Sequence, residues 1–214
     1  LIALTGALFG GYYEIVIETA DTIVLPDRFI DDYGVSERAI RAAARQGIRF
    51  IVTVDCGITA HEQIETACSL GCRVVVIDHH EPAEQLPPAA AVVAPRLTNW
   101  QYVQPDMPAS ALTLKFVQVL EEVVPGRTGR VNPQNLVDLA AVGIVADVAP
   151  LSGENRVIVR AGLDRLARTS VPGLRALMEV AQVRVPVRAH DIGFRIAPRI
   201  NAVGRLADAA DALE

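Results

Sequence analysis

Two nearly uninterrupted aliphatic runs, each followed directly by an aspartate, constrain the fold of this chain most strongly. The first is RFIVTV (Arg49–Val54) before Asp55, and the second is RVVVI (Arg73–Ile77) before Asp78. Aliphatic runs of this length are typical of strands that are buried on both faces, as in parallel sheets covered by helices. We therefore expect both runs to be neighbouring strands inside an α/β domain.

The segments around these runs have the patterns of helices and of further strands. SERAIRAAARQG (Ser36–Gly47) starts at a serine cap and stops at glycine, and AHEQIETACSLG (Ala60–Gly71) also ends in glycine. DTIVLP (Asp21–Pro26) and AAAVVAP (Ala89–Pro95) are short, apolar and bounded by proline or polar residues. Strand–helix–strand units of this length connect parallel strands, so the predicted fold class is α/β, with a mostly parallel sheet flanked by helices.

From about Pro108 onward the pattern becomes helical. The predicted helices cover residues 110–124, 133–151, 155–169 and 171–183. The helix at 133–151 begins with Pro133 at a first-turn position. We expect a helical C-terminal part that leads into a connecting helix.

Composition excludes several classes of protein. The chain has 214 residues, 51% hydrophobic and 21% charged, and contains no apolar run of the roughly 20 residues that span a bilayer. LIALTGALFGGYYEIV at the N-terminus lacks the basic region of a signal peptide. The three cysteines form no CxxC pair, which favours reduced thiols in a cytoplasmic protein with no membrane association. Because the first residue is not Met, we expect the chain to begin inside a longer protein.

Charge is distributed unevenly along the chain. Residues 1–155 carry ten Lys and Arg against nineteen Asp and Glu, whereas residues 156–205 carry ten Arg against three acids (Asp164, Glu179 and Asp191). Such a basic segment suggests an anionic partner near the C-terminal part, although solvated, arginine-rich helices give the same pattern.

The residues that follow the two strands have the chemistry of a metal site. Asp55 follows the first strand, and Asp78, His79 and His80 follow the second. The carboxyl ends of parallel strands share one edge of a sheet, where ligands gather. Asp147 comes after a long apolar helix, where a partly buried acid needs a partner such as a divalent cation. Mixed carboxylate and imidazole ligands suit Mn²⁺ or similar cations.

Each of these residues also has a simpler interpretation. Asp55 could cap the helix that follows it. His79 and His80 could be loop histidines with neutral partners, and Asp147 could pair with an arginine. Their occurrence together in the sequence favours the metal site.

Several ordered motifs resemble those of the DHH phosphoesterase superfamily, and within it the RecJ-type exonucleases. VTVDCG, VVVIDHH and VADVAPL carry the first part of the resemblance. LPDRF (Leu25–Phe29) running to Tyr33 and Gly34, ENR (Glu154–Arg156) and GFRIAPRINAVGRL (Gly193–Leu206) extend it. The similarity covers nearly the whole chain from about Thr5.

The resemblance implies a role for each matching residue. Asp55 would bridge two metal ions, His79 and Asp147 would be metal ligands, and Asp78 would orient or ligate. His80 would lie near the scissile phosphate. The positions expected to contact nucleotide or phosphate are Arg28, Tyr33 and Arg199, with Asn201 and Arg205 as weaker candidates. Residues 1–195 would form the phosphoesterase domain, and 196–214 the start of an interdomain connecting helix.

The chain departs from the family pattern at its N-terminus. The family's first motif, Asp-x-Asp-x-Asp-Gly, has no counterpart, because only LIA precedes the helix start LTGAL. We expect the first strand and its aspartates either to lie upstream of Leu1 or to be altered, and the loss of this strand would expose a neighbouring strand's edge. The family's second domain would lie after Glu214. Ser110–Leu112 also differ from the family, which usually has glycine there.

The implied activity is metal-dependent 5′→3′ hydrolysis of single-stranded DNA with two Mn²⁺ or Mg²⁺ ions, in DNA repair and recombination. A single-strand-binding protein or a helicase would be a partner. The alternatives are an oligoribonuclease or nucleotide phosphatase of the same superfamily, a non-catalytic replication scaffold, and a chain made inactive by truncation. Substrate length separates the first of these from the exonuclease.

Overall fold

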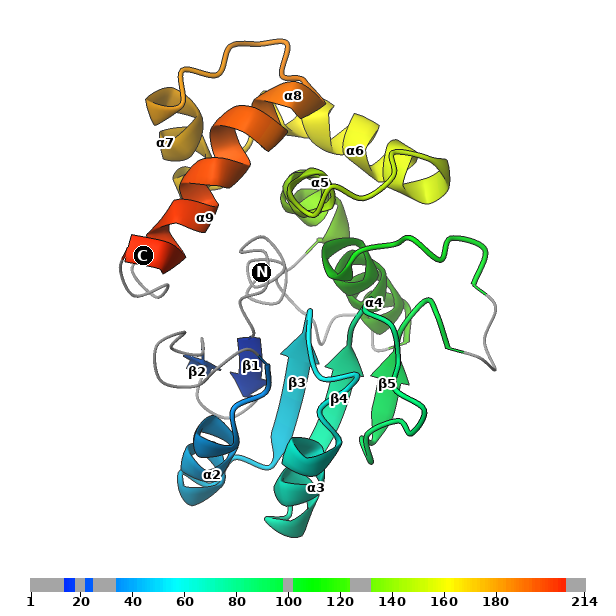
Figure 1. The fold of residues 1–214 in the computed structure, drawn as a ribbon. Helices are drawn as coiled ribbons and strands as arrows, with labels where there is room; N and C mark the ends of the chain where they lie inside the picture. The colour runs from blue at the N-terminus through cyan, green and yellow to red at the C-terminus, as the bar shows by residue number, and fades with distance from the viewer. Residues whose placement is uncertain (1–13, 18–21, 25–33, 98–101, 124–131, 207–214) are drawn as a thin grey trace.

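A five-stranded sheet and the helices of the first half of the chain form the lower part of the molecule, and the helices of the second half form the upper part (Figure 1). The computed structural model describes residues 14–17, 22–24, 34–97, 102–123 and 132–206, with backbone alone for 14–17, 22–24 and 203–206. The strands are β1 (Glu14–Ile17), β2 (Thr22–Val24), β3 (Phe50–Val54), β4 (Arg73–Ile77) and β5 (Ala91–Val93). Their order is β2-β1-β3-β4-β5. β3, β4 and β5 are parallel, whereas β1 pairs antiparallel with both β2 and β3.

The helices of the first half lie between the strands in the chain. They are α2 (Glu37–Arg45) and α3 (His61–Ser69). Ser36 caps α2, because its hydroxyl oxygen accepts a hydrogen bond from the Ala39 amide at 3.2 Å. The helices of the second half are α4 (Ala109–Val123), η1 (Pro133–Leu136), α5 (Val137–Ala146), α6 (Gly153–Leu166), α7 (Pro172–Val180), α8 (Ala189–Asp191), the π-helical η2 (Ile192–Ile196) and α9 (Ala197–Leu206).

Alternating side chains of the central strands serve two hydrophobic cores. Ile51, Val74 and Val76 pack with α2 and α3 on one face of the sheet. Val54 and Ile77 pack with α4 and α5 on the other face. Because side chains alternate along a strand, a strand covered on both faces must be apolar at nearly every position. This explains the two continuous aliphatic runs.

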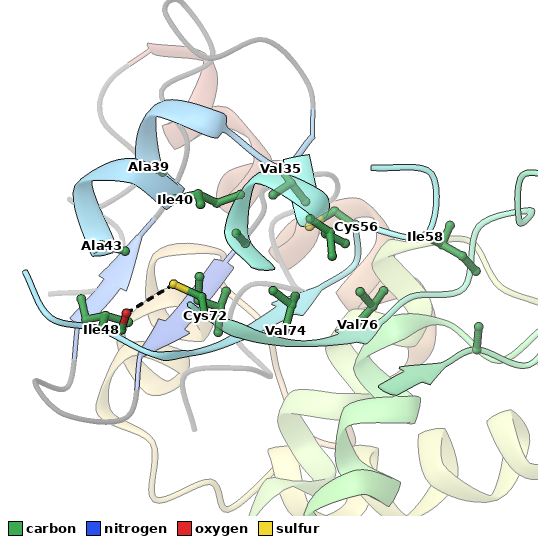
Figure 2. Close-up of a cluster of buried hydrophobic side chains, with 14 residues drawn as sticks. Val35, Ala39, Ile40, Ala43, Ile48, Cys56, Ile58, Cys72, Val74 and Val76 are labelled. Atoms are coloured by element: carbon green, nitrogen blue, oxygen red, sulfur yellow. Dashed lines mark hydrogen bonds between the residues drawn. The ribbon is translucent and has the colours of Figure 1, made fainter. Parts of the chain in front are cut away.

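Figure 2 shows the core on the side of α2 and α3. Val74 and Val76 of β4 point toward Ile40 of α2, and Cys72 donates a weak hydrogen bond to the carbonyl of Ile48 at 3.4 Å. Cys56 belongs to the same cluster and directly follows Asp55. The residues that precede the ends of β3 and β4 are therefore fixed by hydrophobic packing on both faces of the sheet.

The helical part has a core of its own, centred on α5. Gly162 of α6 lies so close to α5 that a Cβ atom at this position would overlap Val137 and Ala141. α5 is buried almost all round along Val137–Ile144, so its C-terminal end is held firmly over the sheet. Figure 1 shows α5 above the arrowheads of β3 and β4.

The structure confirms the α/β class with flanking helices and the strand within Asp21–Pro26, and it corrects two predictions. The edge of β3 is not exposed, because β1 pairs along it. β1 was not predicted, because a run of four residues is too short to be identified as a strand from the sequence alone. The helix predicted over 133–151 begins as η1 and ends at Ala146. The strand predicted at Asp21–Pro26 is β2, which joins the sheet antiparallel at its edge. None of the helices in the described part of the chain has the length and apolar character of a membrane span.

Candidate metal centre

Asp55 stands at the carboxyl end of β3, where the backbone is held in an unusual conformation. Its φ is +64°, and its amide donates to the Ile77 carbonyl at 2.9 Å, continuing the β3–β4 pairing by one residue. Residues other than glycine rarely adopt positive φ, and such residues cluster at functional sites. Gly57 follows at φ +103°, and the resulting turn leaves the Asp55 side chain at the sheet edge. This side chain is 8% exposed.

Asp78 is the most heavily hydrogen-bonded acid of the site. Its Oδ2 accepts from the Ile58 amide at 3.0 Å, and its Oδ1 accepts from the amides of His79 and His80 at 2.7 and 3.2 Å. The ring Nδ1 of His80 lies 2.7 Å from the same Oδ1. The Asp78 side chain is 1% exposed. Asp78 therefore links the end of β4 to the turn that follows β3 and holds both histidines in place.

His79 lies between two carboxylates from different parts of the chain. Its Nε2 is 3.0 Å from Asp55 Oδ1, and its Nδ1 is 3.8 Å from Asp147 Oδ2. His80 lies beside it, with the two ring centroids 4.5 Å apart. Residues that follow β3, β4 and α5 thus converge at one edge of the sheet.

Asp147 is the cap residue at the C-terminal end of α5. Its side chain is 33% exposed. The next residue, Val148, has φ +57°, which is strained for a β-branched residue. Asn155, fully buried, donates from Nδ2 to the carbonyls of Asp106 and Pro150 at 2.9 and 3.1 Å. The loop that carries Asp147 is thereby fixed at both ends, by α5 and by Asn155.

The ionisation of the two histidines reflects this crowding of acids. Burial alone lowers the pKa of His79, but the hydrogen bond to Asp55 and the charges of Asp55 and Asp147 outweigh it, so the pKa lies above the usual 6.5. The hydrogen bond to Asp78 raises the pKa of His80 above the same value. Without a cation, protons on the imidazoles balance the acids.

The two acids that flank the histidines respond in opposite directions. Burial alone would raise the pKa of Asp78, but its hydrogen bonds to His80 and the Ile58 amide hold the pKa below the usual 3.8. Burial raises the pKa of Asp147 above 3.8, although the charge of His79 opposes it. Asp78 is therefore the firmly ionised acid, and Asp147 lacks a partner strong enough to offset its burial.

These side chains fit a divalent cation. One ligand atom from each of Asp55, His79 and His80 lies within 4.8 Å of the others. Asp147 adds a carboxylate 3.8 Å from His79. Carboxylate and imidazole donors match the preferences of Mn²⁺ and related ions. A cation would also replace the histidine protons that now balance Asp55.

A cavity of about 450 Å³ opens beside the cluster on the side of His80. It is lined by Gly34, Val35, Asp55, Cys56, Gly57, Thr59, Ala60, Gln63, Asp78 and His80. Its wall is formed by the turn after β3 and the start of α3. A substrate group in this cavity would meet His80 and Asp55 directly.

The structure does not support the simpler interpretations of Asp55, the two histidines and Asp147. Asp55 does not cap α3, because the N-cap of that helix is Ala60 and makes no side-chain hydrogen bond. His79 and His80 face carboxylates instead of neutral partners. Within the described part of the chain, the ion-pair partner of Asp147 is His79 and not an arginine.

The predicted substrate contacts are less fully visible. Arg28 and Tyr33 lie outside the described residues, and Arg205 is described only as backbone in α9. Arg199 is exposed and donates to the Arg195 carbonyl at 2.7 Å. Asn201 is partly buried, and its Oδ1 has no hydrogen-bond partner among the described residues. Neither Arg199 nor Asn201 forms a described hydrogen bond with the metal-site cluster.

Sequence reasoning missed several residues that shape the site. The Ile58 amide supports Asp78, and the Thr53 hydroxyl donates to the Cys56 carbonyl at 3.0 Å inside the turn. Asn155 was recognised only as part of the ENR motif, and Gln63 lines the cavity without any pattern that marks it. Backbone amides and single polar residues carry no periodic signal, so only the fold reveals them.

Comparison with known proteins agrees with this geometry. A family model described as "DHH family, N-terminal domain" matches residues 5–144. The chain is 37% identical over 190 residues to the single-stranded-DNA-specific exonuclease RecJ of Bacillus subtilis, covering 88% of this chain and 23% of the relative. The RecJ of Escherichia coli is 37% identical over 195 residues, covering 86% and 34%. That of Thermus thermophilus is 40% identical over 189 residues, covering 88% and 27%.

Solved structures show the same similarity. A crystal structure of exonuclease RecJ bound to manganese has a TM-score of 0.77 at 38% identity, covering 88% of this chain and 46% of that chain. The structure of Thermus thermophilus RecJ in complex with Mn²⁺ has a TM-score of 0.71 at 36% identity, covering 83% and 26%. The chain thus spans about a quarter to a third of the length of these curated relatives.

Proposed function

This chain belongs to the DHH family, and on that basis we propose that it is the phosphoesterase part of a metal-dependent exonuclease that hydrolyses single-stranded DNA in the 5′→3′ direction. The observation that supports the proposal most directly is the convergence of Asp55, His79 and His80, whose ligand atoms lie within 4.8 Å of one another. The RecJ relatives support the choice of single-stranded DNA as substrate.

Two Mn²⁺ or Mg²⁺ ions are the proposed cofactors, and Asp55, His79 and Asp147 would hold them. Bound at this edge, they would supply positive charge to polarise the phosphodiester and to favour ionisation of a water. Ions of this kind usually complete their coordination with water and substrate phosphate. The acids of this chain would hold the ions at the mouth of the cavity.

His80 would act on the phosphate itself. Its Nδ1 is fixed by the ionised Asp78 at 2.7 Å, which leaves Nε2 as the nitrogen available to a substrate. The side chain is 55% exposed, and in the metal-free protein the hydrogen bond to Asp78 raises its pKa above 6.5. Nε2 can therefore donate a hydrogen bond or a proton to a phosphate oxygen. Asp78 would orient this imidazole or serve as a further metal ligand.

The remaining roles follow from the resemblance and are proposals of the same kind. Arg28, Arg199, Asn201 and Arg205 would contact phosphate, and Tyr33 would stack on a base. The phosphoesterase domain would cover residues 1–195, and α9 would belong to the connecting helix at 196–214. The biological setting would be DNA repair and recombination in the cytoplasm, with a single-strand-binding protein or helicase as partner.

The test uses Asp55→Ala and His79→Ala in the intact parent protein. Both variants should lose Mn²⁺-dependent release of nucleotides from a 5′-labelled single strand while keeping their circular dichroism spectrum. Asp164→Ala, which removes an exposed acid on α6, is the matched control. Full turnover in both site variants would refute the proposal, and cleavage restricted to very short oligoribonucleotides would favour the alternative activity.

A further inference from the structure

A second concavity, of about 960 Å³, lies at the loop that joins α7 to α8. This loop arches over the end of the helical part that is farthest from the sheet (Figure 1). The cavity is lined by Glu179, Gln182, Val183, Arg184, Val185, Pro186, Arg188, His190, Asp191 and Arg195. We call this cavity the distal groove. None of the metal-site residues lines it.

The distal groove carries an excess of positive charge. Arg184, Arg188 and Arg195 line it against two acids, Glu179 and Asp191. Asp191 is already engaged, since its Oδ2 accepts from the Arg188 amide at 3.0 Å and its Oδ1 lies 3.7 Å from Arg195 Nε. Arg184 makes no ion pair with any residue that the structure describes. Arg195 also donates from Nη1 to the Gln182 carbonyl at 3.1 Å, so the exposed guanidinium groups of Arg184 and Arg188 are the ones most open to an anion.

An exposed aromatic pair adjoins these arginines. Phe194 is 72% exposed, and its ring stacks on that of His190 with centroids 4.6 Å apart and planes 26° apart. Both residues lie on the continuous helix formed by α8, η2 and α9, and Phe194 and Arg195 fall within its π-helical turn. π-Helical turns are rare and are often found at functional sites. An exposed aromatic ring beside cationic groups offers the combination of stacking face and positive charge that single-stranded nucleic acids bind.

We propose that the distal groove binds the phosphodiester backbone of a single-stranded nucleic acid, with one base stacked on Phe194. This inference rests on the proposed nuclease function, because it assigns to the same substrate a contact away from the metal site. Arg184, Arg188 and Arg195 bind phosphates, and the Phe194–His190 pair provides the flat apolar face that a base requires. Arg199 continues the basic surface one helical turn beyond Arg195.

The aromatic pair favours nucleic acid over an acidic peptide as the occupant. Carboxylates of a peptide would be recognised by the arginines alone and would leave the Phe194 face uncovered. A nucleic acid offers both a phosphate for the arginines and a base for the Phe194 ring. Arginines outnumber acids within residues 156–205, and this positive charge also favours a polyanion as the partner.

The test measures binding of a fluorescent oligothymidylate of about 15 nucleotides by anisotropy in EDTA, so that no metal contributes. Arg184→Ala combined with Arg188→Ala should weaken binding and lower the slope of log affinity against log salt by about 1.4, the value for two lost phosphate contacts. Phe194→Leu should weaken binding about tenfold with little change in slope, and Phe194→Tyr should restore it.

The matched control is Arg160→Ala combined with Arg168→Ala, which removes the same charge from exposed positions on and just after α6. An equal loss of slope in this control, or an unchanged slope in the groove variant, would overturn the inference. So would a polyglutamate peptide that binds where the oligonucleotide does not. Protection of Arg184 and Arg188 from phenylglyoxal by the oligonucleotide gives a readout on the unaltered protein.

Mn²⁺-dependent cleavage of a dinucleotide separates this inference from the proposed function. The groove variant should cleave a dinucleotide at the unaltered rate, because no residue of the metal-site cavity lines the groove. If the unaltered protein cleaves no single-stranded DNA, the proposed function is wrong. The binding measurements in EDTA would still test whether the distal groove binds nucleic acid.

Discussion

His79 Nε2 lies 3.0 Å from Asp55 Oδ1, so that the ends of β3 and β4 are joined by an imidazole–carboxylate contact. Asp147 approaches the other nitrogen of the same ring at 3.8 Å. A proton held in this contact would occupy a position that a metal ion would take. Stability and metal affinity should therefore respond to pH in opposite ways.

The first prediction concerns the pH dependence of the metal-free fold. The raised pKa values of His79 and His80 stabilise the fold below pH 6.5, and this contribution is lost as the pH rises through the folded-state values. The lowered pKa of Asp78 stabilises the fold above pH 3.8, and this contribution is lost as the pH falls through its folded-state value. Thermal unfolding in EDTA should show a maximum between these limits.

Mn²⁺ binding should strengthen over the range in which this stability declines, because the cation must displace a proton from His79. Calorimetry in buffers of different ionisation enthalpy counts the protons released. A flat affinity between pH 6 and 8 would contradict the position of His79 in the site. His79→Gln should remove the His79 share of the decline in metal-free stability above pH 6.5 and leave that of His80.

The second prediction is that Asp78→Asn destabilises the protein by about 2 kcal/mol, since a neutral amide cannot accept all the hydrogen bonds that converge on the carboxylate. The pKa of His80 should return toward 6.5. Urea unfolding and an NMR titration of the His80 ring measure the two effects. Asp164→Asn, at an exposed position on α6, should change stability by less than about 0.5 kcal/mol.

The third prediction concerns the turn after β3. Gly57 has φ +103°, and an added Cβ would lie 2.6 Å from Thr53 Oγ1. Gly57→Ala should therefore cost about 1–3 kcal/mol and should weaken Mn²⁺ binding through displacement of Asp55. Gly173→Ala is the control, because its Cβ would meet nothing within 4 Å on α7 and should stabilise that helix slightly. Equal effects of the two substitutions would show that the turn is not constrained.

The fourth prediction is that Val148→Gly stabilises the fold by about 0.5–1 kcal/mol. Val148 is 87% exposed and has φ +57°, so its side chain gains little from packing and strains the backbone. Thermal unfolding measures the change. Val157→Gly, an exposed valine inside α6, should instead be slightly destabilising. A loss of stability in Val148→Gly would mean that the strain is absent.

The sequence alone was sufficient to predict the central strands and the acids that follow them. A strand buried on both faces must be apolar throughout, which made β3 and β4 recognisable from local composition. Parallel strands end at one edge, which placed Asp55 and Asp78 together. The family motifs extended this to Asp147, whose distance along the chain conceals its position.

Only the tertiary structure decided how these residues meet. The distance from His79 to Asp55, the positive φ of Asp55 and the amides gathered on Asp78 depend on how three distant segments pack. The pairing of β1 with β3 and the basic groove beside Phe194 likewise arise from contacts between separate elements. Local patterns fix which elements form and which face each buries, because those choices depend on neighbouring residues. Separations of a few ångströms depend on the packing of the whole core, which no short stretch of sequence encodes.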